Sequence, residues 1–248
     1  MTDPDWPEGV DRIVLDEVDS TMAEAARRAP NLTRPTWIMA RRQTAARGRR
    51  GKAWANPEGN LAATLVFRPD ATPAEAALRS FLAANALHAA LSESVEPEHL
   101  ALKWPNDVLL NGGKVAGILL ESTGVEARID WLAIGVGVNL VAAPTGLDQA
   151  AFPPVSLAGE SGRQMSPDDL LARLAYHMAR EEDDFAAKGF APARARWLAQ
   201  AARLGRIITA TTSRENHEGT FKTIDETGQL VLSTPKGQVV LPAGDVFF

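Results

Sequence analysis

One short stretch of the chain alternates arginine with glycine and ends in a tryptophan, reading Arg47-Gly48-Arg49-Arg50-Gly51-Lys52-Ala53-Trp54 shortly after Gln43. Guanidinium groups bind phosphate and carboxylate oxygens through two parallel hydrogen bonds, and glycines let the backbone approach an anion closely. The indole of Trp54 offers a flat face for a nucleobase. The stretch by itself leaves three interpretations open: a solvated surface loop, an arginine-rich RNA-binding segment, or a clamp for an anionic ligand.

A second group of reactive side chains surrounds a predicted hairpin. Lys103-Trp104-Pro105-Asn106-Asp107 leads, through the turn Asn111-Gly112-Gly113, to Lys114-Val115-Ala116-Gly117. Glycine tolerates the positive φ of such turns, and cross-strand neighbours converge, so two lysines, an asparagine and an aspartate meet. This set can hold a phosphate, a metal ion and a carboxylate together. Asn139 ends a nearby apolar run, where it either caps a strand or contacts a ligand with its amide.

Hydrophobic patterning predicts the elements that position these residues. Strands are expected at 12–15, 37–40, 61–67, 100–103, 107–110, 114–121 and 129–140. A helix is expected to begin after Thr21 and to end near Pro30, because Thr21 and Glu24 have capping-box spacing ahead of an Ala-rich segment. Further helices are expected over 73–95, 168–186 and 191–201, with loops over 41–60 and 142–154.

The pattern changes near Gly205. Short strands are predicted at 207–212, 219–224, 230–233 and 239–241, separated by turns at 226–228 and 235–237. Strands at this spacing are typical of a small barrel. We therefore expect an α+β domain over residues 1–202 and a small β-barrel over residues 203–248.

The composition excludes several classes of mechanism. The chain has 248 residues, of which 45% are hydrophobic and 23% charged, the balance of an ordinary soluble globular protein. It has no cysteine, which excludes disulfides, zinc thiolate sites, iron–sulfur clusters and a cysteine nucleophile. The net charge of −5 argues against a surface that coats nucleic acid, and no apolar run approaches the length of a membrane helix. The sequence therefore predicts a cytoplasmic protein without a DNA or membrane partner.

Taken together, the motifs resemble those of the biotin protein ligases over nearly the whole chain. The matching features are Ser20-Thr21, Gln43, the Arg47–Gly51 loop with Trp54, the Lys103–Asp107 box, Lys114–Gly117, the run that ends at Asn139, and the C-terminal barrel. One departure is Ala46, where the family usually has glycine; alanine there would cost about 1 kcal/mol if the position required a positive φ. Only Met1 to Asp19 precede the first motif, so the resemblance is to the monofunctional type without an N-terminal DNA-binding domain.

The resemblance implies both a fold and a reaction. The fold is a mixed β-sheet with flanking helices, like that of class II aminoacyl-tRNA synthetases and of the biotin and lipoate ligase catalytic domain, plus a C-terminal SH3-like β-barrel. Such enzymes join biotin to ATP and pass the biotinyl group from biotinyl-5′-AMP to one lysine of a biotin carboxyl carrier domain, in acetyl-CoA carboxylase or a related carboxylase. The expected ligands are biotin, ATP and Mg²⁺, and a homodimer is compatible with the resemblance.

The same resemblance assigns roles to individual residues. The expected catalytic residues are Lys114 and Arg49. Contacts with biotin are expected from Ser20, Thr21, Gln43, Arg47, Gly48, Arg49 and Lys114. Contacts with ATP or the adenylate are expected from Arg47, Arg50, Trp54, Lys103, Asn106, Asp107 and Asn139. Asp107 is also the candidate ligand for Mg²⁺, which binds through few carboxylates when phosphates supply the rest.

The nearest alternative is an ATP-dependent lipoate or octanoate protein ligase of the same broad fold. Octanoyl transfer through a cysteine thioester is excluded because the chain has no cysteine. An ATP-dependent lipoate ligase passes that test, but the resemblance to it does not include the Arg47–Gly51 loop. A pure binding module built on the barrel would leave the converging lysines and arginines unexplained.

Overall fold

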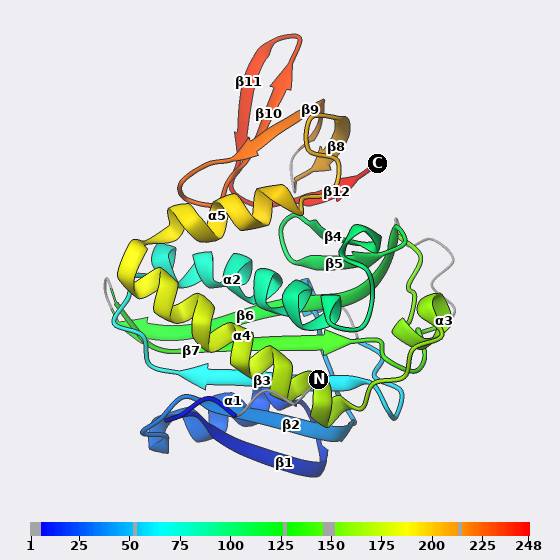
Figure 1. The fold of residues 1–248 in the computed structure, drawn as a ribbon. Helices are drawn as coiled ribbons and strands as arrows, with labels where there is room; N and C mark the ends of the chain where they lie inside the picture. Colours follow the sequence, from blue (N-terminus) through cyan, green and yellow to red (C-terminus); the bar gives the residue numbers. More distant parts are fainter. Residues whose placement is uncertain (1–5, 52–53, 126–127, 146–151, 213–214) are drawn as a thin grey trace.

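A seven-stranded mixed sheet forms the larger part of the protein in the computed structural model, which describes residues 6–51, 54–125, 128–145, 152–212 and 215–248 (Figure 1). Its strands are β1 (Asp11–Val18), β2 (Thr36–Gln43), β3 (Leu61–Phe67), β4 (Leu100–Lys103), β5 (Asp107–Leu110), β6 (Gly113–Val125) and β7 (Arg128–Val138). They lie in the order β1-β2-β3-β7-β6-β5-β4. Strands β1 and β2 are parallel, and the other neighbours are antiparallel. The predicted α+β class with a mixed sheet is confirmed.

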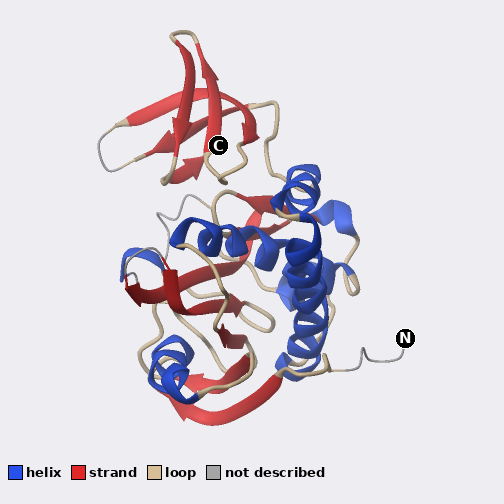
Figure 2. Cartoon of the chain, turned by 90° about the vertical axis from the view of Figure 1, so that its left-hand side faces the viewer, coloured by secondary structure: helices blue, strands red, loops and turns tan. Residues whose placement is uncertain are grey.

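Helices cover both faces of this sheet (Figures 1 and 2). One face carries α2 (Pro73–Ser92), α4 (Pro167–Lys188) and α5 (Phe190–Ala199), and the other carries α1 (Thr21–Arg28). Strand β2 shows how the sequence encodes this arrangement, because side chains alternate between the faces of a strand. Trp37 and Met39 pack in the main core, whereas Ile38 packs with Met22 of α1.

The helix that follows β1 starts one residue earlier than its capping signal suggested. Ser20 is the N-cap, with extended backbone (φ −158°, ψ 135°), and its side chain accepts a hydrogen bond from the backbone N–H of Met22. The predicted capping box of Thr21 and Glu24 is therefore wrong, because Thr21 already lies within the helix. The capping box that does form is at α2, where Thr72 and Glu75 bond each other's backbone amides.

Other boundaries differ from the predicted ones in ways that affect the site. Strand β2 extends to Gln43, since its parallel ladder with β1 continues to the pair Val18–Gln43, so the predicted loop begins after this residue. Helix α2 ends at Ser92 rather than near residue 95, and the short α3 (Leu157–Ser161) was not predicted. Short 3₁₀ turns, also not predicted, lie at η1 (Ala29–Asn31), η2 (Arg49–Gly51) and η3 (Pro97–His99).

The backbone angles test two expectations from the sequence, namely the hairpin turn after β5 and the cost of alanine at position 46. Asn111 (φ 50°) and Gly112 (φ 82°) connect β5 to β6, so the predicted hairpin is confirmed. Ala46 has no positive φ, and the expected cost of alanine at that position therefore does not arise. Within the described part of the loop, the residues with positive φ are Arg50 (56°), Gly51 (71°) and Gly59 (90°).

The C-terminal part is a five-stranded antiparallel sheet. Its strands are β8 (Ile207–Thr211), β9 (Asn216–Ile224), β10 (Leu230–Thr234), β11 (Gly237–Leu241) and β12 (Asp245–Phe247), in the order β11-β10-β9-β8-β12. The predicted small C-terminal β unit is confirmed. Strand β12 was not predicted, because three residues are too few to show a period of two.

The two sheets share one continuous core through helices α2 and α5. Trp104 donates a hydrogen bond from Nε1 to the carbonyl of Gly228 at 3.1 Å, and Arg194 donates from Nε to the carbonyl of Ile224 at 2.6 Å. These contacts hold the end of β9 and the turn that follows it against the larger domain. In the described residues, no helix is long and apolar enough to cross a membrane.

We expect Gly228→Ala to destabilise the protein by about 2–4 kcal/mol. Gly228 has φ +79°, and a Cβ there would lie 2.6 Å from the Phe81 ring, so a conformational cost of about 1 kcal/mol adds to an overpacking cost of about 1–3 kcal/mol. Gly205→Ala is the matched control, because Gly205 has φ +74° but its Cβ would meet nothing within 4 Å. Urea unfolding measures both; equal losses would contradict the proposed packing of Gly228 on α2.

Candidate active site

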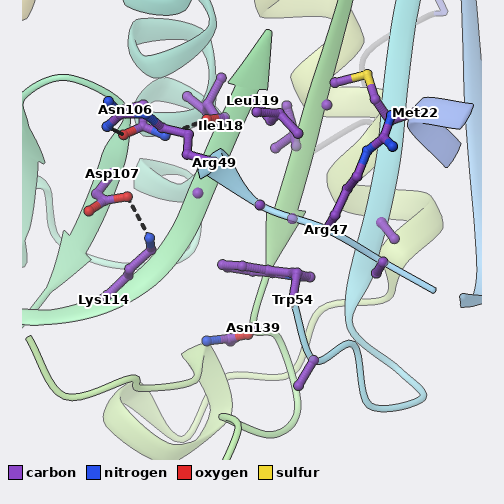
Figure 3. A pocket seen from close by; sticks show the side chains of 18 of the residues that line it. Met22, Arg47, Arg49, Trp54, Asn106, Asp107, Lys114, Ile118, Leu119 and Asn139 are labelled. Atoms are coloured by element: carbon purple, nitrogen blue, oxygen red, sulfur yellow. Dashed lines mark hydrogen bonds and ion pairs between the residues drawn. The ribbon is translucent and has the colours of Figure 1, made fainter. Parts of the chain in front are cut away.

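A cleft of about 1120 Å³ is lined by residues of α1, of the larger sheet and of β12. Figure 3 shows it from close by. The structure brings into this one cleft every residue that the sequence singled out for a role. They are Ser20, Thr21, Gln43, Arg47, Gly48, Arg49, Arg50, Trp54, Lys103, Asn106, Asp107, Lys114 and Asn139. They come from separate segments between residues 20 and 139, and β12 of the smaller sheet adds Asp245, Val246 and Phe247 to the lining, so the cleft exists only in the folded chain.

Glycines of β7 form the floor of the cleft. The run alternates, with Val136 packed in the main core and Gly135 and Gly137 on the opposite face. A Cβ at Gly137 would lie 2.7 Å from the Trp54 ring, and one at Gly135 would lie 2.9 Å from the Met22 methyl group. Missing side chains therefore create the depth of the cleft, and one strand supplies both the core and the floor.

Three polar side chains meet at one end of the cleft. Gln43 Oε1 accepts a hydrogen bond from the Thr21 backbone N–H at 2.8 Å and lies 3.2 Å from the Thr21 hydroxyl. Ser20 stands beside them as the N-cap of α1. Both Ser20 and Thr21 are buried, and apolar residues such as Met22 and Ile118 line the adjoining wall. This end suits an apolar ligand that carries a compact polar head.

A buried carboxylate joins two lysines in the middle of the cleft. Asp107 Oδ2 lies 3.1 Å from Lys103 Nζ, and Asp107 Oδ1 lies 2.6 Å from Lys114 Nζ (Figure 3). The ladder pairs Lys103 with Asp107, and the hairpin returns Lys114 to the same place. Burial acts to raise the pKa of Asp107, but the two ammonium groups outweigh it and hold that pKa below its ordinary value. Burial lowers the pKa of Lys103, although Asp107 opposes the shift.

The arginine loop is fastened to the smaller sheet. Arg50 lies 2.6 Å from one carboxylate oxygen of Asp245 in β12, and Arg49 lies 3.7 Å from the other. Arg49 also donates a hydrogen bond at 3.1 Å to Asn106, whose amide is held by the carbonyl of Ile118 at 2.5 Å. Burial lowers the pKa of Arg49, against the opposing charge of Asp245.

The third arginine of the loop points to a different wall. Arg47 lies 3.0 Å from Glu121 of β6. Each cation of the cleft thus faces a carboxylate of the protein: Glu121, Asp245 or Asp107. An anionic ligand would therefore take over existing ion pairs instead of meeting free charges.

Two polar atoms in the wall are left for a ligand. Among the described residues, neither Trp54 Nε1 nor Asn139 Oδ1 has a hydrogen-bond partner, and both atoms are buried. The other amide atom of Asn139 donates to the carbonyl of Val155 at 3.0 Å, which fixes its orientation. The Trp54 ring lies 5.5 Å from Lys114 Nζ. A buried donor and a buried acceptor without partners suit a heterocyclic ligand that carries both groups.

Sequence reasoning missed four residues that shape the cleft. Asp245 and Glu121 hold the arginines, Thr64 of β3 lies on the floor, and Asn60 fixes the segment after Asn139. Asn60 Oδ1 accepts hydrogen bonds from three successive backbone amides, those of residues 140–142, at 2.9–3.3 Å. Thr64 was detectable as the polar residue inside the apolar run Leu61–Phe67. The sequence around Asp245 and Glu121 has no comparable pattern that would indicate their place in the cleft.

The described residues hold no group of three or more histidine, aspartate or glutamate side chains that would bind a metal ion. Asp107 meets a lysine at each of its oxygens, and Asp245 meets arginines. A cation at either carboxylate would displace a side-chain cation. The donor set does not fit a metal held by the protein alone, although Mg²⁺ arriving on a nucleotide needs few protein ligands.

Comparison with known proteins agrees with the geometry. The profile of the biotin/lipoate A/B protein ligase family matches residues 14–139, and that of the biotin protein ligase C terminal domain matches residues 204–248. The chain belongs to the biotin protein ligase family. It is 49% identical over 238 residues to a biotin–[acetyl-CoA-carboxylase] ligase of Paracoccus denitrificans, with 95% of this chain and 99% of that protein covered.

More distant biotin protein ligases extend the comparison. A bifunctional ligase/repressor of Bacillus subtilis is 29% identical over 94% of this chain and 73% of its own length. The structure of the Aquifex aeolicus biotin protein ligase in complex with biotin and ATP superposes with a TM-score of 0.81, at 24% identity, covering 95% of this chain and 97% of that one. The similarity to the Aquifex aeolicus structure is a similarity of fold.

We expect Asp107→Asn to cost about 3 kcal/mol of stability, because removing one partner leaves buried charge uncompensated. Glu17→Gln is the control: its partner Arg42 is exposed, so the loss should stay below about 1 kcal/mol. Raising the pH should restore part of the loss, since the unfolded chain holds the Lys103 proton more tightly than the folded chain. Denaturant unfolding at several pH values measures this; equal losses in the two variants would contradict the electrostatic role.

Proposed function

We propose that this protein activates biotin with ATP and transfers it to a lysine of a biotin carboxyl carrier domain of acetyl-CoA carboxylase. The observation that carries the proposal is the arrangement of the cleft in a member of the biotin protein ligase family. The cleft combines a polar end for a compact head group, an apolar wall and a group of cations. This combination matches the ureido head, the aliphatic tail and the carboxylate of biotin.

Binding of the ureido head is the proposed role of Ser20, Thr21 and Gln43, with the loop backbone at Gly48. A site built on such hydrogen bonds rejects analogues that lack them, because its own buried polar groups would be left without partners. The wall formed by Met22 and Ile118 suits the tail. These contacts direct the biotin carboxylate toward Lys114.

Adenylation brings two anions together. A carboxylate oxygen of biotin attacks the α-phosphorus of ATP, the bond to the bridging oxygen breaks, and pyrophosphate leaves. We assign Lys114 and Arg49 to the reacting carboxylate and phosphate, where fixed positive charge stabilises the transition state. Lys103, Arg47 and Arg50 are assigned to the nucleotide phosphates. Asp107 holds the two lysines in place until the substrates arrive.

The nucleotide is proposed to bind beside the two free polar atoms. Trp54 can cover the base, with its Nε1 and the Asn139 oxygen offering one donor and one acceptor. Asn106 and Asp107 lie close to the phosphate region. Mg²⁺ is proposed to enter as part of the ATP substrate, since the residues that the structure describes offer no separate set of carboxylates for it.

The second step uses a nucleophile from the carrier. Its lysine amine attacks the acyl carbon of biotinyl-5′-AMP, the bond to AMP breaks, and an amide forms with loss of one proton. A lysine with an ordinary pKa of about 10.4 has to lose a proton first. Asp107 is a weak base for this proton, because Lys103 and Lys114 hold its pKa below the ordinary value. The loop from Arg47 to Gly51 is proposed to exclude water, which would hydrolyse the adenylate.

Two further assignments follow from this scheme. We propose that residues 1–202 form the catalytic domain and residues 203–248 a separate C-terminal domain that contributes Asp245. The lipoate ligase alternative is not favoured, because the C-terminal profile is that of biotin protein ligases and the relative that is 49% identical is a biotin–[acetyl-CoA-carboxylase] ligase.

The direct test is formation of the acyl-adenylate. Purified protein is mixed with ATP, Mg²⁺ and either biotin or lipoate, and the products are examined by mass spectrometry. Biotinyl-5′-AMP should form in the first mixture, and no lipoyl-AMP in the second. Lipoyl-AMP alone would overturn the proposal.

We expect Lys114→Ala to fold and to form the adenylate about 10²–10³-fold more slowly, as is typical when one electrostatic contact with a transition state is removed. Asp107 keeps Lys103 as a partner in this variant, so the fold should persist. Lys222→Ala, at an exposed position of β9, is the control and should be fully active. Single-turnover kinetics measure the rate; a wild-type rate for Lys114→Ala would remove it from the catalytic residues.

A further inference from the structure

A buried threonine on the floor of the cleft is connected to the polar end by a chain of hydrogen bonds. Thr64 lies in the middle of β3 and is 0% exposed. Its hydroxyl lies 2.9 Å from the hydroxyl of Thr21, which lies 3.2 Å from Gln43 Oε1. Thr64 has no place in the proposed reaction so far, and a valine would fill the same volume in a buried strand.

The direction of every bond in this chain follows from one fixed donor. The Thr21 backbone N–H can only donate, and it donates to the side chain of Gln43 at 2.8 Å, so the Gln43 oxygen faces Thr21. An amide oxygen can only accept, so the Thr21 hydroxyl donates its hydrogen to it. Thr21 then has no hydrogen left for Thr64, and Thr64 is the donor in their bond.

These directions fix what the polar end offers a ligand. With its hydrogen used and one lone pair taken by Thr64, Thr21 Oγ1 presents a single remaining acceptor position. Gln43 turns its Nε2 donor away from Thr21. Ser20 accepts from the Met22 N–H, which leaves its own hydrogen to donate. One acceptor therefore stands beside two donors.

We propose that Thr64 is a positioning residue that sets this polarity, so that the cleft selects a head group with an N–H next to a carbonyl. The inference rests on the proposed function, in which that head is the cyclic urea of biotin. Thr64 acts through Thr21: it holds the Thr21 oxygen with one lone pair toward the ligand N–H. Hydrogen bonds in such a chain also polarise one another, which strengthens the acceptor.

Isosteric variants test the role of Thr64. Thr64→Val removes the hydroxyl at nearly constant volume, and Thr64→Ser keeps it. Thr36→Val is the matched control, because Thr36 is also 0% exposed and bonds a backbone carbonyl at 3.0 Å, but it is not among the residues that line the cleft. Biotin affinity is measured by calorimetry, the KM for ATP by adenylate formation, and Tm by circular dichroism.

Thr64→Val should bind biotin roughly 3- to 10-fold more weakly, the range expected for one hydrogen bond. Its KM for ATP should stay within about twofold of the wild-type value, and Thr64→Ser and Thr36→Val should bind biotin like the wild type. Unchanged biotin affinity in Thr64→Val would overturn the inference. Equal weakening in Thr64→Ser, or a parallel loss for ATP, would also overturn it, because either result indicates packing and not polarity. A wild-type protein that does not bind biotin would instead overturn the proposed function, and the inference with it.

The polarity itself is tested with two cyclic carbamate analogues, each with one ureido N–H replaced by oxygen. One of the two places an oxygen against the Thr21 acceptor and should bind the wild type at least about tenfold more weakly than biotin, because a buried acceptor then faces another acceptor. Affinities equal to that of biotin for both analogues would contradict the assigned bond directions.

Discussion

Two ammonium groups meet one carboxylate in the cleft, and the carboxylate and one of the two lysines are buried. Asp107 neutralises Lys103 and Lys114 at 3.1 and 2.6 Å, and it is 9% exposed. Without the carboxylate, the lysines would repel each other through a medium of lower dielectric than water. The registers of β4, β5 and β6, and the tight turn between the last two, are arranged so that these three groups meet. The positions of Lys103 and Lys114 in the cleft depend on their shared contact with Asp107.

The other cations of the cleft are also paired with carboxylates of the protein. Carboxylates of the protein occupy the cations that are proposed to receive the substrate anions, so binding is an exchange of ion pairs. Such an exchange weakens attraction for a stray anion, because the incoming group competes with a partner already in place. A ligand that satisfies several cations together, with its apolar part in the adjoining wall, overcomes that competition. Selectivity then comes from the combination of contacts and not from charge alone.

Most helices and strands could be predicted from the sequence, because the apolar runs are long and their periods are clear. It also led to the residues of the cleft, since Lys103, Asp107 and Lys114 surround a hairpin whose turn is recognisable. The partners of the arginines could not be predicted in this way. Asp245 meets Arg50 across 195 residues, and no local pattern encodes a contact of that range. The N-cap was misplaced because Ser20 and Thr21 are both good capping residues, and only the backbone angles distinguish them.

The contact between the loop and β12 also has a consequence for how the protein is made. A ribosome completes Arg50 long before it reaches Asp245, and at about 5–20 residues per second a separation of 195 residues takes roughly 10–40 s to synthesise. Strands β3 to β7 are added within that interval, so the larger sheet has all its strands before Asp245 exists. The arginines of the loop meet their acidic partner in β12 only when the end of the chain has been made. The order of the elements along the chain therefore makes this contact a late event in biosynthesis.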